Sequence, residues 1–335
     1  MTTLTHPAPQ APSLPLAEIT KSSALTETSR LMLGIAVGLL AASIGALYTV
    51  FARWGIAQGL RSTDLTVLRF AVAGVVTLPV LGLAFWRDAV QFKQRWRIWL
   101  AVALLAGTPF GLLMFGALQF APPSHAAVFP FAAMSVAGML LSAWVFSERL
   151  QARKLLGIAI VLGGLLLLSG LDAASFTSRA ALGDAMFIAA GTLWAGFGIV
   201  LRRHRLDPLL ATAVVSFSAL ITYVPVYLWH TGAAGLLAAA PNVLWVEVLV
   251  QGLIAGTGTL YTYAKMVSLL GPSRAAIFPA LAPGLAALMA WPVLGHMPGA
   301  FEVAGLLIAM SGLLLAVTSR GVSLPAQTPA GALRG

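Results

Sequence analysis

The chain has 335 residues, of which 59% are hydrophobic and only 9% are charged. A soluble domain normally carries about a quarter of its residues as charges, so this composition excludes a protein whose surface faces water. The formal net charge of +10 is spread between long apolar runs instead of forming a basic patch, which argues against nucleic acid as a partner. The sequence contains no cysteine, so disulfides and thiolate metal sites are ruled out.

The apolar runs predict ten transmembrane helices, because about 18 or more apolar residues can cross a bilayer as a helix. Residues 1–30 are polar, contain several prolines and lack the apolar core of a signal peptide, and residues 320–335 are similar. Both segments are expected to be disordered cytoplasmic tails. The approximate helix cores are 31–52, 64–86, 98–119, 125–146, 153–171, 182–201, 209–229, 243–266, 273–294 and 301–319.

The distribution of basic residues predicts the orientation. With the N-terminus in the cytoplasm, sixteen of the twenty Lys and Arg residues fall in cytoplasmic segments, Arg53, Arg61 and Arg179 fall outside, and Arg69 lies within the second helix. Membrane proteins carry their excess of basic residues in cytoplasmic loops. We therefore expect a multi-pass protein of the inner (plasma) membrane with both termini in the cytoplasm.

One short motif occurs twice, as PSHAAVFP from Pro123 to Pro130 and as PSRAAIFP from Pro272 to Pro279. Gly107-Thr108 and Gly256-Thr257 match at the same offset. Each half has five helices, an odd number, so the second half crosses the membrane upside down. The sequence thus predicts an all-α integral membrane protein whose ten transmembrane helices form two inverted five-helix repeats, 31–171 and 182–319, an architecture typical of transporters.

The inverted topology also accounts for the main chemical difference between the two copies. The first copy falls in an outside loop and the second in an inside loop. His125 is mostly neutral at neutral pH, whereas Arg274 is a fixed cation on the side of the membrane that favours cations.

Three longer stretches carry a family resemblance. They are TDLTVLRFAVAG, which contains Arg69, AAVFPFAAMSVAGMLLSAWVFSERL, and YTYAKMVSLLGPSRAAIFPALAPGLAALMAWPVLG, which contains Pro283. They resemble the EamA-type members of the drug/metabolite transporter superfamily, over about residues 31–319. The sequence departs from that pattern at His296, where the family usually has an acidic residue, and at Met134, the first-half counterpart of Pro283. The resemblance implies a bacterial inner-membrane transporter of small metabolites, often amino acids.

The eighth predicted helix offers candidate substrate-binding residues. Drawn at 100° per residue, Gln251, Tyr261, Thr262 and Lys265 fall on one stripe about 100° wide, and polar side chains at membrane depth face the bundle interior or a cavity. The same face of the third helix is apolar. Alternatively, Lys265 snorkels to the cytoplasm and Tyr261 belongs to an interfacial belt. For Arg69 we expect a local hydrogen bond or snorkelling instead of substrate contact.

Two aromatic residues and three prolines complete the candidate site. Trp194 and Tyr48 lie within their helices and could stack on an apolar or aromatic substrate, with ordinary packing as the alternative. Pro130, Pro279 and Pro283 interrupt backbone hydrogen bonding. They either free carbonyl groups for a ligand or only kink their helices.

These features favour an alternating-access secondary transporter that exports an amino acid or a related metabolite. All acidic residues fall in tails, loops or span ends, which favours facilitated diffusion over proton exchange, with titration of Glu247 or Lys265 as the alternative. The rival classes are an intramembrane enzyme and a non-transporting sensor or scaffold. HExxH, GxSxG and GxxxxGK[ST] motifs are missing, so neither catalysis nor ATP drive is expected. The expected partners are a small-molecule substrate and the lipid bilayer, without cofactor, metal or nucleic acid; the substrate, coupling ion and oligomeric state stay open.

Overall fold

The computed structural model describes residues 16–117, 119–121, 123–169, 174, 176–295 and 297–318. This part of the chain is helical apart from its connections and contains no β-strand. Ten of its stretches are long and apolar enough to cross a bilayer. The ten transmembrane helices predicted from the sequence are therefore confirmed. His296, one of the two departures from the family pattern, lies outside the described residues.

The first half of the chain forms five spans, of which the third is broken. A short helix, α3 (Ala89–Gln94), connects the second span to the third. The break in the third span falls at Gly107, immediately before Thr108. The spans are α1 (Leu16–Ala57), α2 (Ser62–Arg87), α4 (Trp96–Ala106) followed by α5 (Thr108–Ala117), α6 (Pro123–Phe146) and α7 (Ala152–Ser169).

The second half also forms five spans, and two of them depart from regular α-helix. The eighth span contains a π-helix and the ninth a 3₁₀-helix. The short helix α10 (Ala234–Ala238) precedes the eighth span. The spans are α8 (Ser178–Arg203), α9 (Pro208–His230), α11 (Pro241–Glu247) with η2 (Val248–Thr257) and α12 (Gly258–Leu270), α13 (Pro272–Ala275) with η3 (Phe278–Leu281) and α14 (Ala282–Leu294), and α15 (Ala300–Val317).

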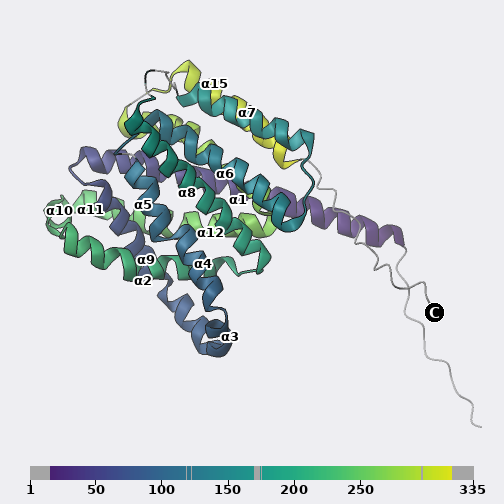
Figure 1. The fold of residues 1–335 in the computed structure, drawn as a ribbon, viewed down its shortest axis with the longest axis horizontal. Helices are drawn as coiled ribbons and strands as arrows, with labels where there is room; N and C mark the ends of the chain where they lie inside the picture. Colours follow the sequence, from purple (N-terminus) through teal and green to yellow (C-terminus); the bar gives the residue numbers. More distant parts are fainter. Residues whose placement is uncertain are drawn as a thin grey trace, which may run out of the picture.

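The helices pair across the two halves as an internal repeat requires. α7 packs against α15, and α2 packs against α9, so in both pairs a helix contacts its own counterpart. α6 packs against α8, and the counterparts of these two helices, α14 and α1, also pack together. Figure 1 shows α7 and α15 side by side at one edge of the bundle.

The contact between α7 and α15 depends on two matched pairs of glycines. A Cβ atom built on Gly157 would lie 2.7 Å from the carbonyl oxygen of Gly312, and one built on Gly312 would lie 2.6 Å from the carbonyl oxygen of Gly157. Gly164 and Gly305 meet in the same reciprocal way. Such distances are impossible for a real side chain, so only glycine lets these backbones approach, as in other small-residue contacts between membrane helices.

Exposed tryptophans lie near the ends of the spans. Trp86 and Trp144 lie near the ends of α2 and α6, and Trp229 and Trp245 lie at the opposite end of the bundle; all four are exposed. Tryptophan favours the interface between lipid and water. The described spans thus present an apolar surface to lipid, bounded by aromatic side chains at both ends.

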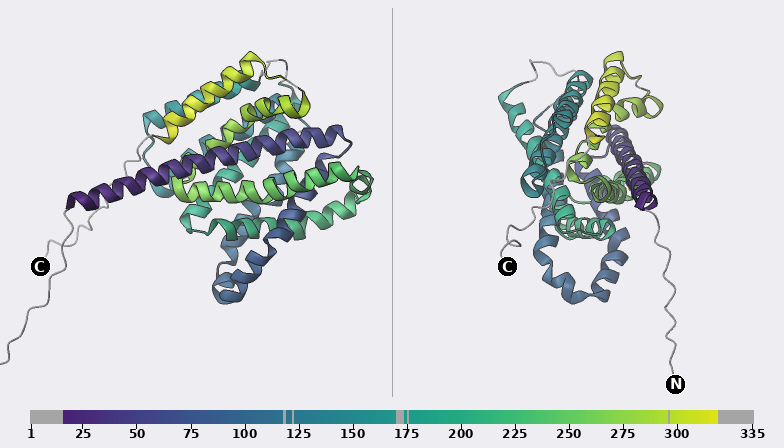
Figure 2. Two further views of the ribbon diagram at one scale, coloured as in Figure 1. Left: turned by 180° about the vertical axis from the view of Figure 1, so that it is seen from behind. Right: turned by 90° about the vertical axis from the view of Figure 1, so that its right-hand side faces the viewer.

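Helix α1 is longer than its predicted span. It begins at Leu16, within the segment that the sequence assigns to a disordered tail, and its first turns extend beyond the bundle (Figure 2). The proline cluster ends at Pro15, and the residues that follow include the good helix formers Leu, Ala, Glu and Lys. Residues 1–15 and 319–335 lie outside the described part of the chain.

Candidate functional site

A small cavity of about 70 Å³ lies in the middle of the bundle. Its walls come from both halves of the chain: α1, α2, α5 and α6 from the first half, and α8, α12, η3 and α14 from the second. A central site at the interface between repeats is where secondary transporters bind their substrates. The lining residues are Ala41, Ala42, Gly45, Tyr48, Arg69, Phe110, Met114, Pro130, Phe131, Met134, Trp194, Thr259, Tyr263, Pro279 and Ala282.

Aromatic rings form one wall of this central cavity. The centroid of the Trp194 ring lies 4.8 Å from that of Phe110 and 4.9 Å from that of Tyr263. Phe197 stacks on Tyr263 with the centroids 6.0 Å apart. These contacts hold the rings against one another, so one wall of the cavity is an apolar, aromatic surface.

Three polar atoms of the cavity lining have no hydrogen-bond partner within the described structure. They are Nε1 of Trp194, the hydroxyl oxygen of Thr259 and the hydroxyl oxygen of Tyr263, and all three are buried. A buried polar group without a partner costs free energy, so such groups need an explanation. A ligand in the cavity that supplies hydrogen bonds would satisfy the Trp194 and Thr259 atoms, whereas the Tyr263 hydroxyl lies against Gly198, a residue outside the cavity lining.

Among the described residues that line the cavity, Arg69 carries the formal charge. Its guanidinium carbon lies 4.5 Å from the centroid of the Tyr48 ring, a cation–π contact. From the sequence we expect the Arg69 side chain to snorkel or to form a local hydrogen bond. In the structure, Tyr48 of α1 holds this side chain beside the cavity instead.

A much larger cavity, of about 1090 Å³, opens at the end of the bundle that carries the start of α1. We call it the vestibule. Seven of its lining residues are basic (Arg30, Arg149, Lys154, Arg202, Arg203, Arg205 and Arg274) and two are acidic (Glu27 and Glu148). Glu148 contacts both Arg202 and Lys154. The vestibule therefore carries a net positive charge that attracts anions.

An aromatic cluster separates the central cavity from the vestibule. Along α8, Trp194 lines the cavity, Phe197 follows one turn later, and Leu201 lines the vestibule. Along α12, Tyr263 lines the cavity and Ala264 lines the vestibule. Because Trp194, Phe197 and Tyr263 contact one another, we refer to them as the aromatic partition.

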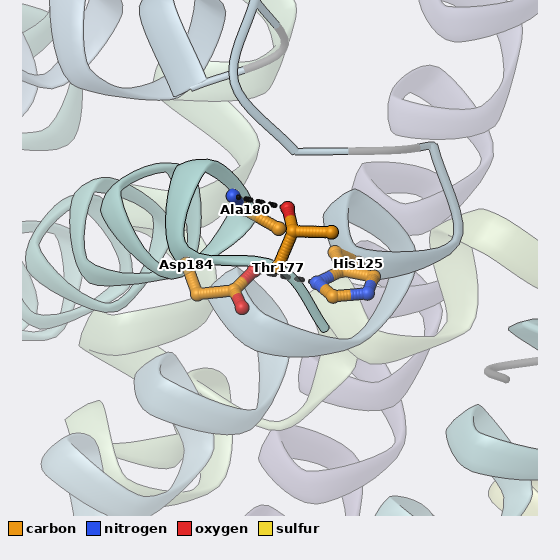
Figure 3. Close-up of polar contacts among 4 residues, drawn as sticks. All are labelled: His125, Thr177, Ala180 and Asp184. Atoms are coloured by element: carbon orange, nitrogen blue, oxygen red, sulfur yellow. Dashed lines mark hydrogen bonds and ion pairs between the residues drawn. The ribbon is translucent and has the colours of Figure 1, made fainter. Parts of the chain in front are cut away.

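Buried polar contacts tie the helices together at the opposite end of the bundle. His125 of α6 and Asp184 of α8 form a hydrogen bond with 2.7 Å between Nδ1 and Oδ1, next to Thr177, which caps α8 by accepting a hydrogen bond from the Ala180 N–H (Figure 3). The hydroxyl of Tyr227 donates to the Asp64 carboxylate at 2.6 Å. These contacts link α6 to α8 and α2 to α9.

Four of the residues proposed from the sequence meet at the cavity. Trp194, Tyr48, Pro130 and Pro279 all line it. Pro283 does not belong to the lining and lies in the first turn of α14, immediately after η3. Whether these side chains bind substrate or act in gating stays a prediction.

The polar stripe predicted on the eighth span does not line the cavity. The amide of Gln251 donates to the backbone carbonyl of Tyr48 at 2.8 Å, and the hydroxyl of Thr262 donates to the Gly258 carbonyl of its own helix. Tyr261 is 38% exposed on the outside of the bundle, and Lys265 belongs to the lining of neither cavity. The geometric reason is the π-helix η2, in which each residue turns through less than 100°, so the predicted stripe does not stay on one face.

Other features of the site were not found from the sequence. Phe110, Phe131 and Tyr263 line the cavity, although nothing in the local pattern distinguishes them from packing residues. Phe131 directly follows the repeated motif, which was the available signal. Glu247, predicted at a span end, is fully buried.

The fold and site together define a multi-pass membrane transporter with an internal repeat and a central cavity. The sequence profile of the EamA-like transporter family matches residues 32–170 and again residues 181–318. The chain belongs to this family, so the family resemblance is confirmed, and its partners include a small-molecule substrate and the lipid bilayer.

Individual relatives agree with this assignment. The chain is 27% identical to the "Probable amino-acid metabolite efflux pump" of Salmonella typhimurium, over 76% of this chain and 90% of the relative, and 25% identical to the Escherichia coli protein of the same name, over the same shares. It is 28% identical to "Aromatic amino acid exporter YddG" of Ancylobacter novellus, over 52% of this chain and 63% of that protein. A solved crystal structure shares the fold with a TM-score of 0.65 at 19% identity, covering 86% of this chain and 96% of that one.

Proposed function

We propose that the chain is an alternating-access exporter of amino acids or closely related metabolites in the bacterial inner membrane, with both termini in the cytoplasm. The observation that carries the proposal is the position of the central cavity, which lies between the two halves and is separated from a wide vestibule by the aromatic partition. The amino-acid efflux relatives supply the substrate class and the direction of transport.

The geometry supports a specific cycle. In this conformation the vestibule opens at the end that the basic residues assign to the cytoplasm, while the His125–Asp184 and Asp64–Tyr227 contacts hold the opposite end together. Substrate enters the cavity when the aromatic partition separates. Exchange of the two halves between near-equal arrangements then breaks the outer contacts, closes the vestibule and releases the substrate outside.

Exchange of labelled solute tests the transport function. The purified chain in liposomes loaded with unlabelled amino acids is expected to accumulate the same amino acids in radiolabelled form, chemically unchanged, above protein-free liposomes. A panel should span aromatic, aliphatic and polar amino acids. Failure to exchange any of them, or recovery of the label in a different compound, would refute an amino acid carrier.

Cysteine labelling tests the orientation, since the chain has no native cysteine. Arg179 lies just inside the start of α8, Arg203 lies at its end, and both are exposed. In intact cells an impermeant thiol reagent is expected to label Arg179→Cys but to label Arg203→Cys only after permeabilisation. The reverse pattern would place both termini outside and the vestibule at the periplasmic face.

A further inference from the structure

Arg69 is placed at the central cavity by backbone packing. In η2, a Cβ atom on Gly256 would lie 2.7 Å from the carbonyl oxygen of Arg69, so the glycine lets the π-helix press directly on α2 at this residue. On the other side, the Tyr48 ring of α1 lies under the guanidinium. The position of the charge is therefore set by three helices, which is the rigidity that a binding group needs.

No carboxylate in the described part of the chain forms an ion pair with Arg69. The acidic residue nearest to it along α2 is Asp64, whose two oxygens accept hydrogen bonds from the Tyr227 hydroxyl and the Arg61 backbone N–H. A cation within the membrane normally pairs with an anion because desolvation is costly. The contact with Tyr48 offsets only part of the desolvation cost of the guanidinium. The charge of Arg69 is therefore not balanced by an anion among the described residues that line the central cavity.

The rest of the pathway fits a ligand that brings a negative charge. The vestibule, with seven basic and two acidic lining residues, draws anions toward the partition. Beyond it, one guanidinium matches one carboxylate through two parallel hydrogen bonds. The aromatic wall around Trp194 suits an apolar or aromatic body, and the hydroxyl oxygen of Thr259, which has no hydrogen-bond partner among the described residues, can accept a hydrogen bond from an ammonium group.

We propose that Arg69 binds the carboxylate of the transported substrate, and that the substrate class is a monocarboxylate with an apolar or aromatic side chain, in the simplest case a zwitterionic amino acid. This inference rests on the proposed function and specifies its binding site. A phosphate dianion would need further cations in the cavity, and the described lining supplies none.

Ligand binding to the purified full-length chain in detergent tests this directly and separately from transport. Apparent affinities are taken from the rise in melting temperature with ligand concentration, using L-phenylalanine, L-leucine and L-tryptophan, each with its carboxamide. The wild-type chain is expected to bind the acids about tenfold to a hundredfold more tightly than the amides, the range for hydrogen bonds to a charged partner.

Variants at Arg69 assign that preference to the guanidinium. Arg69→Gln is expected to bind acids and amides with similar affinity, and Arg69→Lys to keep part of the preference, since lysine retains the charge without the planar fork. The matched control is Arg61→Gln, the same substitution on an exposed arginine just before the same helix, which should behave as wild type. If Arg69→Gln fails to fold, the comparison of wild type with Arg69→Lys still shows whether the preference for acids depends on the guanidinium.

The outcomes separate the two proposals. A wild-type chain that binds none of the acids, or binds acids and amides equally, overturns the role of Arg69. So does an Arg69→Gln or Arg69→Lys variant with the full wild-type preference. If binding is selective for acids and depends on Arg69 but liposomes show no exchange, the role of Arg69 is supported and the proposed export function is refuted.

Discussion

The eight residues from Pro123 to Pro130 and the eight from Pro272 to Pro279 differ at only two positions, yet they fold differently. The first copy begins α6, one continuous helix that carries Pro130 in its interior. The second copy divides into the short helix α13, a turn and the 3₁₀-helix η3, and only then does α14 begin. The two copies therefore share their sequence but not their backbone conformation.

The residue that explains the difference lies just beyond the motif. At matching positions the first half has Met134 and the second half has Pro283. A proline lacks the N–H that would donate to the carbonyl four residues earlier. Pro279 and Pro283 remove two such hydrogen bonds one turn apart, whereas Pro130 removes one, and the backbone after Pro279 tightens into a 3₁₀ turn. A repeat that is nearly exact in sequence is thereby made asymmetric next to the cavity.

The largest expected effect concerns the part of the molecule where the two halves are alike. Gly164→Val adds a side chain where a Cβ atom would lie 2.6 Å from the Ala309 nitrogen, and a backbone cannot yield as a side chain can. Overpacking costs about 1–3 kcal/mol or more, so we expect a marked loss of melting temperature and of folded yield. Gly163→Val is the control, because nothing lies within 4 Å of a Cβ atom there. Equal melting temperatures for the two variants would contradict the close contact of α7 and α15.

A smaller effect is expected where the two copies differ in chemistry. His125 is fully buried and paired with Asp184, so His125→Ala leaves a buried carboxylate without this partner, at a cost of about 1–3 kcal/mol. The corresponding Arg274→Ala lies in the lining of the open vestibule, where water replaces the lost contacts, and should cost less than about 1 kcal/mol. Chemical denaturation of both variants measures the difference. A larger loss for Arg274→Ala would show that the inner end holds the bundle together.

Much of the architecture was predictable from the sequence because it depends on local signals. Hydropathy gives the ten spans, and the repeated motif gives the relation between the halves. Pro130 and Pro279 belong to that motif, and Trp194 and Tyr48 are aromatic residues within their predicted spans; all four line the cavity.

The polar residues were harder to place because their environment depends on the neighbouring helices. The π-helix η2 rotates the face of the eighth span, so Gln251 meets the Tyr48 carbonyl and Tyr261 lies outside. Glu247, six residues after Pro241 in the same span, becomes fully buried, although its position in sequence suggests a span end. Arg69 contacts the Tyr48 ring because α1 lies beside α2 at this point. The sequence pattern along α2 alone does not contain this information.

The smallest expected effect on stability, and the most informative one on mechanism, comes from making the second copy resemble the first. Pro283→Met restores a backbone N–H one turn after Pro279 and permits α14 to extend back toward η3. Because Pro283 lies in the first turn of α14, a restored N–H gains a partner only if α14 and η3 join into one continuous helix, so the melting temperature of the observed conformation should change little. Exchange in liposomes should slow by about two- to tenfold, the equivalent of roughly 0.4–1.4 kcal/mol in the barrier, since a stiffer ninth span resists the rearrangement between the halves.

Pro292→Ala is the matched control: it removes a proline from the same helix, at an exposed position away from the cavity lining. If both variants exchange substrate at the wild-type rate, the interruption of the ninth span is a packing feature, and the movement between the halves must take place at other joints, such as the break at Gly107 or the π-helix η2.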